Sequence, residues 1–128
     1  MKLPAAAENI AVIRTEVGAR AASLGMSDAG ILDLQTVVSE ACANVIKYAY
    51  DDDLQGPLEV ELHPDGEHVN LYVRDRGVGI RPRPPSEAPS LKLGLLLIGA
   101  LSRRFSLSSE AGGGTELKVV MALDPQQS

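Results

Sequence analysis

The sequence predicts an α+β domain: a two-layer sandwich in which three helices cover one face of a mixed, mostly antiparallel sheet. Two long segments with apolar residues at helical spacing come first, and most of the alternating strand patterns follow in pairs. Helices that come in blocks and strands that come in hairpins favour this class over a parallel α/β fold. The chain has 128 residues, so we expect residues 1–128 to form a single domain.

Two helices are expected in the first 48 residues. The first runs from about Glu8 to Leu24, and Gly25 follows as a stop signal. The second begins at Ser27 or Asp28, either of which can cap it, and continues to residue 48. Their apolar residues recur every three or four positions: Ile10, Ile13, Val17, Ala21 and Leu24 in the first, and Ile31, Leu34, Val38, Ala41 and Val45 in the second.

A hairpin and a proline-rich segment are expected next. Residues 58–62 and 69–75 alternate between apolar and polar side chains, and the turn at 64–66 separates them. Residues 81–90 hold four of the eight prolines. A linker there would leave too few residues for a second core, so we interpret this segment as a functional loop.

The last third of the chain predicts one helix and a second hairpin. Residues 91–101 are apolar and rich in leucine, as in a helix. Residues 105–109 and 115–123 have strand character, and Gly112-Gly113-Gly114 forms a turn between them.

Charge and composition exclude several classes of protein. With 12 basic and 17 acidic residues, the net charge of -5 argues against a nucleic-acid-binding surface. No apolar run reaches the roughly 20 residues needed to span a bilayer, and the first residues do not form a secretory signal. The single cysteine, Cys42, cannot form an internal disulfide, so we expect a cytoplasmic protein without membrane contact.

Three polar residues share one face of the second helix. Glu40, Asn44 and Lys47 are spaced i, i+4 and i+7, and we expect them to project together away from the core. Carboxylate and amide oxygens suit Mg²⁺, and a carboxylate beside such an ion could orient a hydroxyl. From the spacing alone, a solvated helix face explains the same residues.

Glycine-containing segments mark three further positions. Asp75, at the end of a strand, could accept a hydrogen bond from an exocyclic amine, and Gly77 and Gly79 would let the backbone approach a flat ligand. Gly94 lies where the N-terminus of a helix could face phosphate. Thr115 could hydrogen-bond a ligand or Asp75. In isolation, a plain turn explains the segment at Asp75, packing of a buried apolar helix explains Gly94 better than a phosphate site does, and a hairpin turn explains Thr115 equally well.

The order of these segments resembles the ATP-binding Bergerat fold of gyrase, heat-shock chaperone and histidine-kinase domains, the GHKL group. Within it, the chain is similar to the small anti-sigma factor serine/threonine kinases of bacteria. The resemblance covers roughly residues 3 to 123. The segments are SEACANVIKYAY at 39–50, DRGVGI at 75–80, LGLLLIGAL at 93–101 and GGGTELKVVM at 112–121.

The resemblance implies roles for the phosphate end of a nucleotide site. Asn44 would bind Mg²⁺, and Glu40 would activate the attacking hydroxyl. Gly94 would lie near the phosphates, Lys47 occupies a frequent basic position, and Lys92 would contribute a charge. Residues 81–93 would form the loop that closes over ATP, the ATP lid.

The resemblance also implies roles at the base end. Asp75 would read the adenine amino group, Gly77 and Gly79 would lie under the base, and Thr115 would lie beside it. Two departures stand out. Tyr48 replaces a frequent histidine, and in the segment 90–95 only Gly94 remains of a glycine-rich lid pattern.

The function implied is that of a protein kinase that uses ATP and Mg²⁺, phosphorylates an anti-anti-sigma (STAS-type) partner and sequesters a sigma factor. A homodimer is expected, with the first helix and the adjacent strand as a possible surface. The glycine-poor lid favours an alternative, a non-catalytic regulatory module that binds nucleotide or none. A histidine-kinase catalytic domain fits less well, because the chain has no dimerisation helix with a phosphoacceptor histidine.

Overall fold

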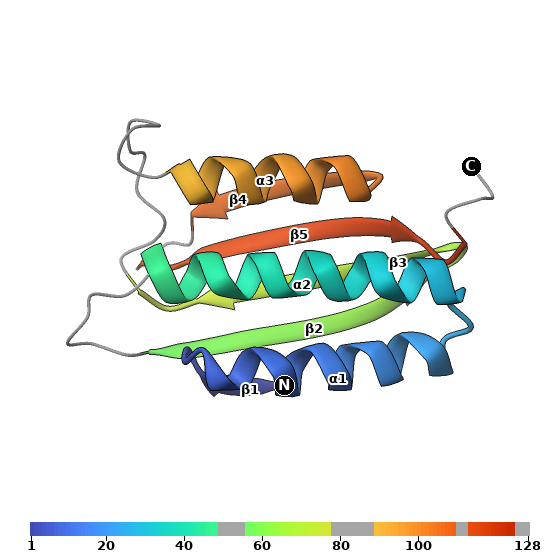
Figure 1. Ribbon diagram of the computed structural model, residues 1–128, viewed down its shortest axis with the longest axis horizontal. Coiled ribbons are helices and arrows are strands. Elements are labelled where there is room, and N and C mark those ends of the chain that lie inside the picture. The colour runs from blue at the N-terminus through green and yellow to red at the C-terminus, as the bar shows by residue number, and fades with distance from the viewer. Residues whose placement is uncertain (49–55, 78–88, 110–112, 125–128) are drawn as a thin grey trace.

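The computed structural model describes residues 1–48, 56–77, 89–109 and 113–124, and within them three helices lie side by side on one face of a five-stranded sheet (Figure 1). The predicted two-layer α+β fold is confirmed. The helices are α1 (Glu8–Ser23), α2 (Asp28–Tyr48) and α3 (Pro89–Leu101). The strands are β1 (Lys2–Pro4), β2 (Pro57–Asp65), β3 (His68–Asp75), β4 (Arg104–Ser109) and β5 (Thr115–Ala122).

The strand order is β1-β2-β3-β5-β4, and every pairing between these strands is antiparallel. The expected mixed sheet is therefore purely antiparallel in the part of the chain that the structure describes. The reason is that β2–β3 and β4–β5 each pair as an antiparallel hairpin, and β5 also pairs with β3 in the antiparallel orientation. The sequence did not predict β1, because three residues are too short to show an alternating pattern.

Two helix starts illustrate how local chemistry sets the boundaries. The Ser27 hydroxyl caps α2, since its Oγ accepts a hydrogen bond from the Gly30 backbone N–H at 3.1 Å. Helix α3 begins at Pro89, two residues before the expected start, and so takes in residues 89–93 of the expected lid. Proline is favourable in the first turn, where its missing N–H would have no helical partner.

Among the described residues, no helix has the length and apolarity needed to cross a membrane.

The core lies between the helices and the sheet. Each helix and each central strand contributes fully buried apolar residues, including Ile13, Leu34, Leu71, Ile98 and Val119. Along β3, every second side chain is buried in this layer, and the last of them is Asp75. The alternation that builds the core thus carries a carboxylate into it at the strand's end.

An ion-pair network on the opposite face of the sheet joins the three strands β2, β3 and β5. Arg74 on β3 donates from Nε to Glu116 Oε2 on β5 at 2.6 Å and from Nη1 to Glu61 Oε2 on β2. The guanidinium also lies 4.9 Å from the centre of the Tyr72 ring. These contacts sit one residue from Asp75 and help to fix the position of the strand end.

Candidate nucleotide-binding site

Asp75 and Thr115 form a buried polar pair at one end of the sheet. They are direct partners in the antiparallel register of β3 and β5. Asp75 is only 1% exposed, and its Oδ1 accepts a hydrogen bond from the Gly77 backbone N–H at 3.0 Å. Its other oxygen, Oδ2, is buried and has no hydrogen-bond partner among the described residues. A buried carboxylate oxygen without a partner is costly, which indicates a position kept for a ligand donor.

The surroundings of Asp75 favour the protonated form of its carboxyl group. Burial raises the pKa of the Asp75 carboxyl, while hydrogen bonds from the backbone of Gly77 and Thr115 oppose that rise. The shift reflects the low-dielectric setting of the strand end. A ligand that donates a hydrogen bond to Oδ2 would stabilise the charged form.

The glycines before β5 are required by close backbone packing. Gly113 and Gly114 both have φ of +102°, a conformation that side-chain-bearing residues rarely adopt. A Cβ atom on Gly114 would lie 2.4 Å from the Asp75 carbonyl oxygen, and one on Gly113 would lie 3.0 Å from the Gly77 carbonyl oxygen. The turn can therefore pass alongside residues 75–77 only because both positions are glycine.

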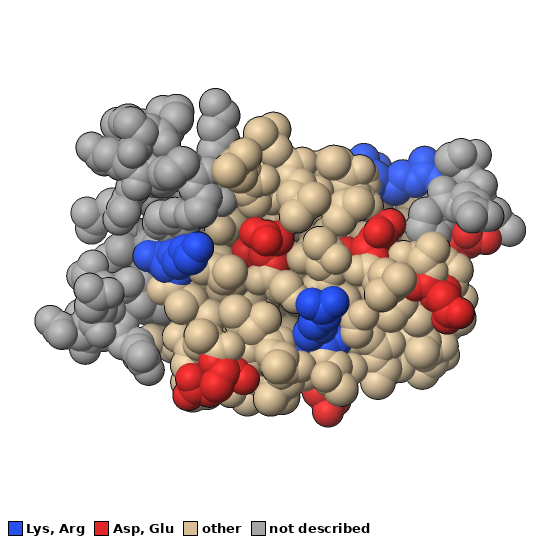
Figure 2. All heavy atoms as spheres, viewed as in Figure 1, with Lys and Arg blue, Asp and Glu red and all other residues tan. Residues whose placement is uncertain are grey.

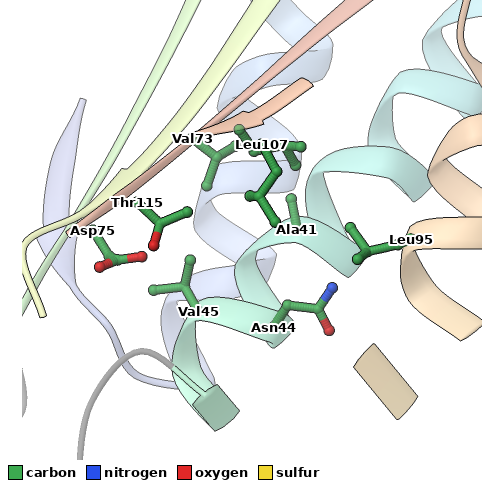
Figure 3. Close-up of a pocket in the computed structure, with 9 residues that line it drawn as sticks. Ala41, Asn44, Val45, Val73, Asp75, Leu95, Leu107 and Thr115 are labelled. Carbon is green, nitrogen blue, oxygen red and sulfur yellow. The ribbon is translucent and has the colours of Figure 1, made fainter. Parts of the chain in front are cut away.

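A largely apolar pocket opens in front of this pair (Figure 3). The space that its walls enclose is small, about 10 Å³, which is room for about one water molecule, and the hollow around it is open to solvent. Asp75, Thr115 and Asn44 are its polar residues. Apolar walls with a few placed polar groups are typical of small-molecule sites. The other lining residues are Ala41, Val45, Val73, Leu95, Leu107 and Leu117.

Glu40, Asn44 and Gly94 meet where α2 and α3 pack together. A Cβ atom on Gly94 would lie 3.0 Å from Glu40 Oε2, 3.1 Å from Asn44 Nδ2 and 3.4 Å from Asn44 Oδ1. The missing side chain at Gly94 therefore lets α3 approach the two polar residues of α2 closely. Asn44 also lines the pocket with Asp75. The Glu40 carboxylate and the Asn44 amide therefore belong to the same site as Asp75.

The Asn44 amide oxygen suits a magnesium ion, and the Glu40 carboxylate lies against the same glycine, Gly94. Mg²⁺ prefers hard oxygen ligands and usually takes one or two from the protein and the rest from water and phosphate. Within the described ranges, no cluster of three or more His, Cys, Asp or Glu side chains could hold a metal ion. This donor set therefore suits an ion that arrives with a phosphate ligand.

The predicted outward projection of the polar face of α2 is only partly correct. Asn44 is buried and Glu40 is half-buried, whereas Lys47 is exposed. Packing of α3 over this face explains the difference, since Gly94 lets the helix come within contact distance of both residues. Helical spacing showed which residues share a face, but it did not show that another helix covers part of it.

Two predicted site residues fall wholly or partly outside the described part of the chain. Gly79 lies in the segment 78–88, which the structure does not describe. Lys92 lies in the first turns of α3, but its side chain is not described. The structure thus brings together Glu40, Asn44, Gly94, Asp75, Gly77 and Thr115 of the predicted residues.

The apolar walls of the pocket were not among the predicted site residues. Val73 and Leu117 could have been found, because each lies two residues from Asp75 or Thr115 along a strand and so shares its face. Leu107 could not, since its position depends on the register between β4 and β5.

Comparisons with known proteins identify the family and the fold. The model of the histidine kinase-like ATPase domain family matches residues 3–121. The chain is 29% identical over 125 residues to the serine-protein kinase RsbW of Bacillus cereus, covering 88% of this chain and 78% of that protein. The corresponding RsbW of Bacillus mycoides is 27% identical over the same length.

Solved structures share the fold. A Mycobacterium tuberculosis protein with RsbU and RsbW domains superposes with a TM-score of 0.67 at 21% identity over 95% of this chain. A blue-light activated histidine kinase of Erythrobacter litoralis gives 0.60 at 22% identity over 80% of this chain. The chain spans 32% and 33% of these two proteins, respectively. From the family match over most of its length, the chain belongs to the histidine kinase-like ATPase domain family.

Proposed function

We propose that this protein is a serine/threonine kinase that uses ATP and Mg²⁺ to phosphorylate an anti-anti-sigma protein of the STAS type, and that it sequesters a sigma factor in its free form. One observation carries the nucleotide part. Asp75, whose buried Oδ2 has no hydrogen-bond partner among the described residues, lines an apolar pocket together with Asn44, and Asn44 and Glu40 both lie against Gly94. Relatives named as serine-protein kinases support the transfer part.

The base end of the pocket has the chemistry needed for adenine. Asp75 Oδ2 is an acceptor that the adenine amino group would satisfy, and the pocket's apolar walls would cover the faces of the ring. The Gly77 N–H already holds Oδ1, so the carboxylate is oriented before the base arrives. Thr115 borders the same space from β5.

The phosphate end has the chemistry needed for transfer. Bound Mg²⁺ would offset the negative charge that the phosphates carry, which is most of what phosphoryl transfer requires. Asn44 supplies an amide oxygen for that ion, and Lys92 is the basic residue that the resemblance places near the phosphates, with Lys47 at a frequent basic position of the family. Gly94 lets the start of α3 pack closely beside Glu40 and Asn44.

Glu40 acts on the incoming hydroxyl. The oxygen of a serine or threonine attacks the γ-phosphorus, the bond to the β–γ bridging oxygen breaks, and ADP leaves. Glu40 orients the hydroxyl and takes its proton, which requires hydrogen-bond reach between the two groups. As part of the same proposal, the protein works in the cytoplasm as a homodimer.

Two variants separate binding from transfer. Calorimetric titration with ATP and Mg²⁺ should show binding to the wild type and to Glu40→Ala, and its loss in Asn44→Ala. In a transfer assay with an anti-anti-sigma protein, Glu40→Ala should be inactive. Normal transfer by Glu40→Ala would refute its role as the base. Binding without any transfer by the wild type would favour the non-catalytic module instead.

A further inference from the structure

The solvent-facing side of α3 is apolar where an exposed helix face is ordinarily polar. Leu93, Leu96 and Leu97 recur at i, i+3 and i+4 and are 66%, 61% and 37% exposed. The opposite side, with Gly94 and Ile98, is buried. A helix that is apolar on all sides is usually buried on all sides. The described residues, however, cover only one side of α3.

Strand β4 extends this apolar area. Phe105 and Leu107 are 37% and 40% exposed, and all six residues of β4 are exposed. A Cβ atom on Gly99 would lie 3.0 Å from Phe105 Cε1, so the Phe105 ring packs against α3 at this position. We call Leu93, Leu96, Leu97, Phe105 and Leu107 the α3 apolar surface. Figure 2 shows the surface over most of α3 without charged residues.

The α3 apolar surface is continuous with the nucleotide site. Leu93 directly precedes Gly94, which packs against Glu40. Leu107 belongs both to the exposed surface and to the lining of the pocket that contains Asp75. A protein that brings a hydroxyl within hydrogen-bond reach of Glu40 must cover the surface around that carboxylate. On the α3 side, Leu93 adjoins Gly94 in the chain, and Leu97 follows one turn later on the exposed side.

We propose that the α3 apolar surface is the docking surface for the protein phosphoacceptor, which presents its serine or threonine beside an uncharged, apolar contact patch. This inference rests on the proposed function. Depletion of charge and exposed apolar anchors are typical of the centre of a protein interface. A second copy of this chain on α3 would cover the approach to Glu40, which favours the acceptor as the occupant.

The test places a charge on this surface outside the nucleotide site. Leu96→Glu is compared with Val12→Glu, which adds the same charge to an exposed apolar position on α1, beyond α2 from α3 (Figure 1). Calorimetry measures the Kd of each variant for the anti-anti-sigma protein used in the transfer assay, and separately for ATP with Mg²⁺. Leu96→Glu should weaken acceptor binding by about tenfold or more, while Val12→Glu changes it less than about twofold. Both variants should bind nucleotide as the wild type does.

Each other outcome contradicts the inference in a recognisable way. Unchanged acceptor affinity and transfer by Leu96→Glu would refute the docking surface while the proposed kinase function stands. If Leu96→Glu instead dissociates a dimer in sedimentation measurements and leaves acceptor affinity unchanged, the occupant is a second copy. If the wild type neither binds nor phosphorylates the acceptor, both proposals fail. Thermal unfolding of both variants checks that the fold is retained.

Discussion

The two ends of the proposed nucleotide site are built in different ways. At the base end, the antiparallel register of β3 and β5 places Asp75 opposite Thr115, and backbone packing against Gly114 leaves little freedom. At the phosphate end, Glu40 and Asn44 depend on how closely α3 packs against α2 at Gly94. Strand register is set by many hydrogen bonds, whereas helix packing depends on a few side chains. The base end should therefore tolerate few substitutions, whereas the side chains at the phosphate end should be able to shift when a neighbouring residue is substituted.

The largest expected effect is at the rigid base end. Gly114→Ala should lower the free energy of unfolding by at least about 2 kcal/mol, because the backbone conformation is unfavourable for alanine and its Cβ would clash with the Asp75 carbonyl oxygen. The matched control is Gly66→Ala, at φ of +62° with open space around it, which should cost about 1 kcal/mol. Urea unfolding measures both. Equal losses would show that the contact with Asp75 contributes nothing.

The same contrast explains what could be predicted from the sequence. The strand end at Asp75 and the strand start at Thr115 follow from local patterns, since alternation and turn glycines reveal both strand and face, but the pairing of the two residues does not. The resemblance then assigned the roles. The fold class followed from the order of the helical and strand patterns. The short β1, the purely antiparallel pairing, the end of β2 at Asp65 and the exact start of α3 were missed.

The phosphate end was harder to predict because it depends on contacts far apart in the sequence. Helical spacing placed Glu40 and Asn44 on one face, but not the burial of Asn44 beneath α3. That burial requires knowing that Gly94, fifty residues later, lies against both side chains. The exposure of Leu96 likewise could not be inferred, because an apolar helix pattern ordinarily predicts burial.

The next largest effect concerns base recognition. Asp75→Asn should weaken nucleotide binding by about 10- to 100-fold, because a hydrogen bond to a charged acceptor contributes about 1.5–3 kcal/mol. It should not lower the free energy of unfolding at neutral pH, since it removes a buried charge whose Oδ2 has no partner among the described residues. Titration with ATP and urea unfolding test the two statements separately.

The pH dependence of that variant gives a further check. Burial raises the pKa of Asp75 above that of the unfolded chain, so the carboxyl contributes most to stability in acid and loses that contribution as pH rises through its folded pKa. The stability of Asp75→Asn relative to the wild type should therefore be most favourable at neutral pH and decline as the pH falls towards about 4. A relative stability that instead improves on acidification would contradict the raised pKa.

The smallest expected effect is at the adjustable phosphate end, and it compares two glycines of the same helix. Gly94→Ala brings a methyl group against Glu40 and Asn44, and their displacement should weaken binding of ATP with Mg²⁺ by roughly 3- to 10-fold, as expected for an off-rotamer cost near 1 kcal/mol. Adenosine, which has no phosphates, should bind as it does to the wild type. Gly99→Ala is the control, because its methyl group would meet the Phe105 ring at 3.0 Å. It should leave the binding of ATP and of adenosine unaffected. A loss of adenosine affinity in Gly94→Ala would show that the two ends are coupled, and the contrast between a rigid base end and an adjustable phosphate end would be wrong.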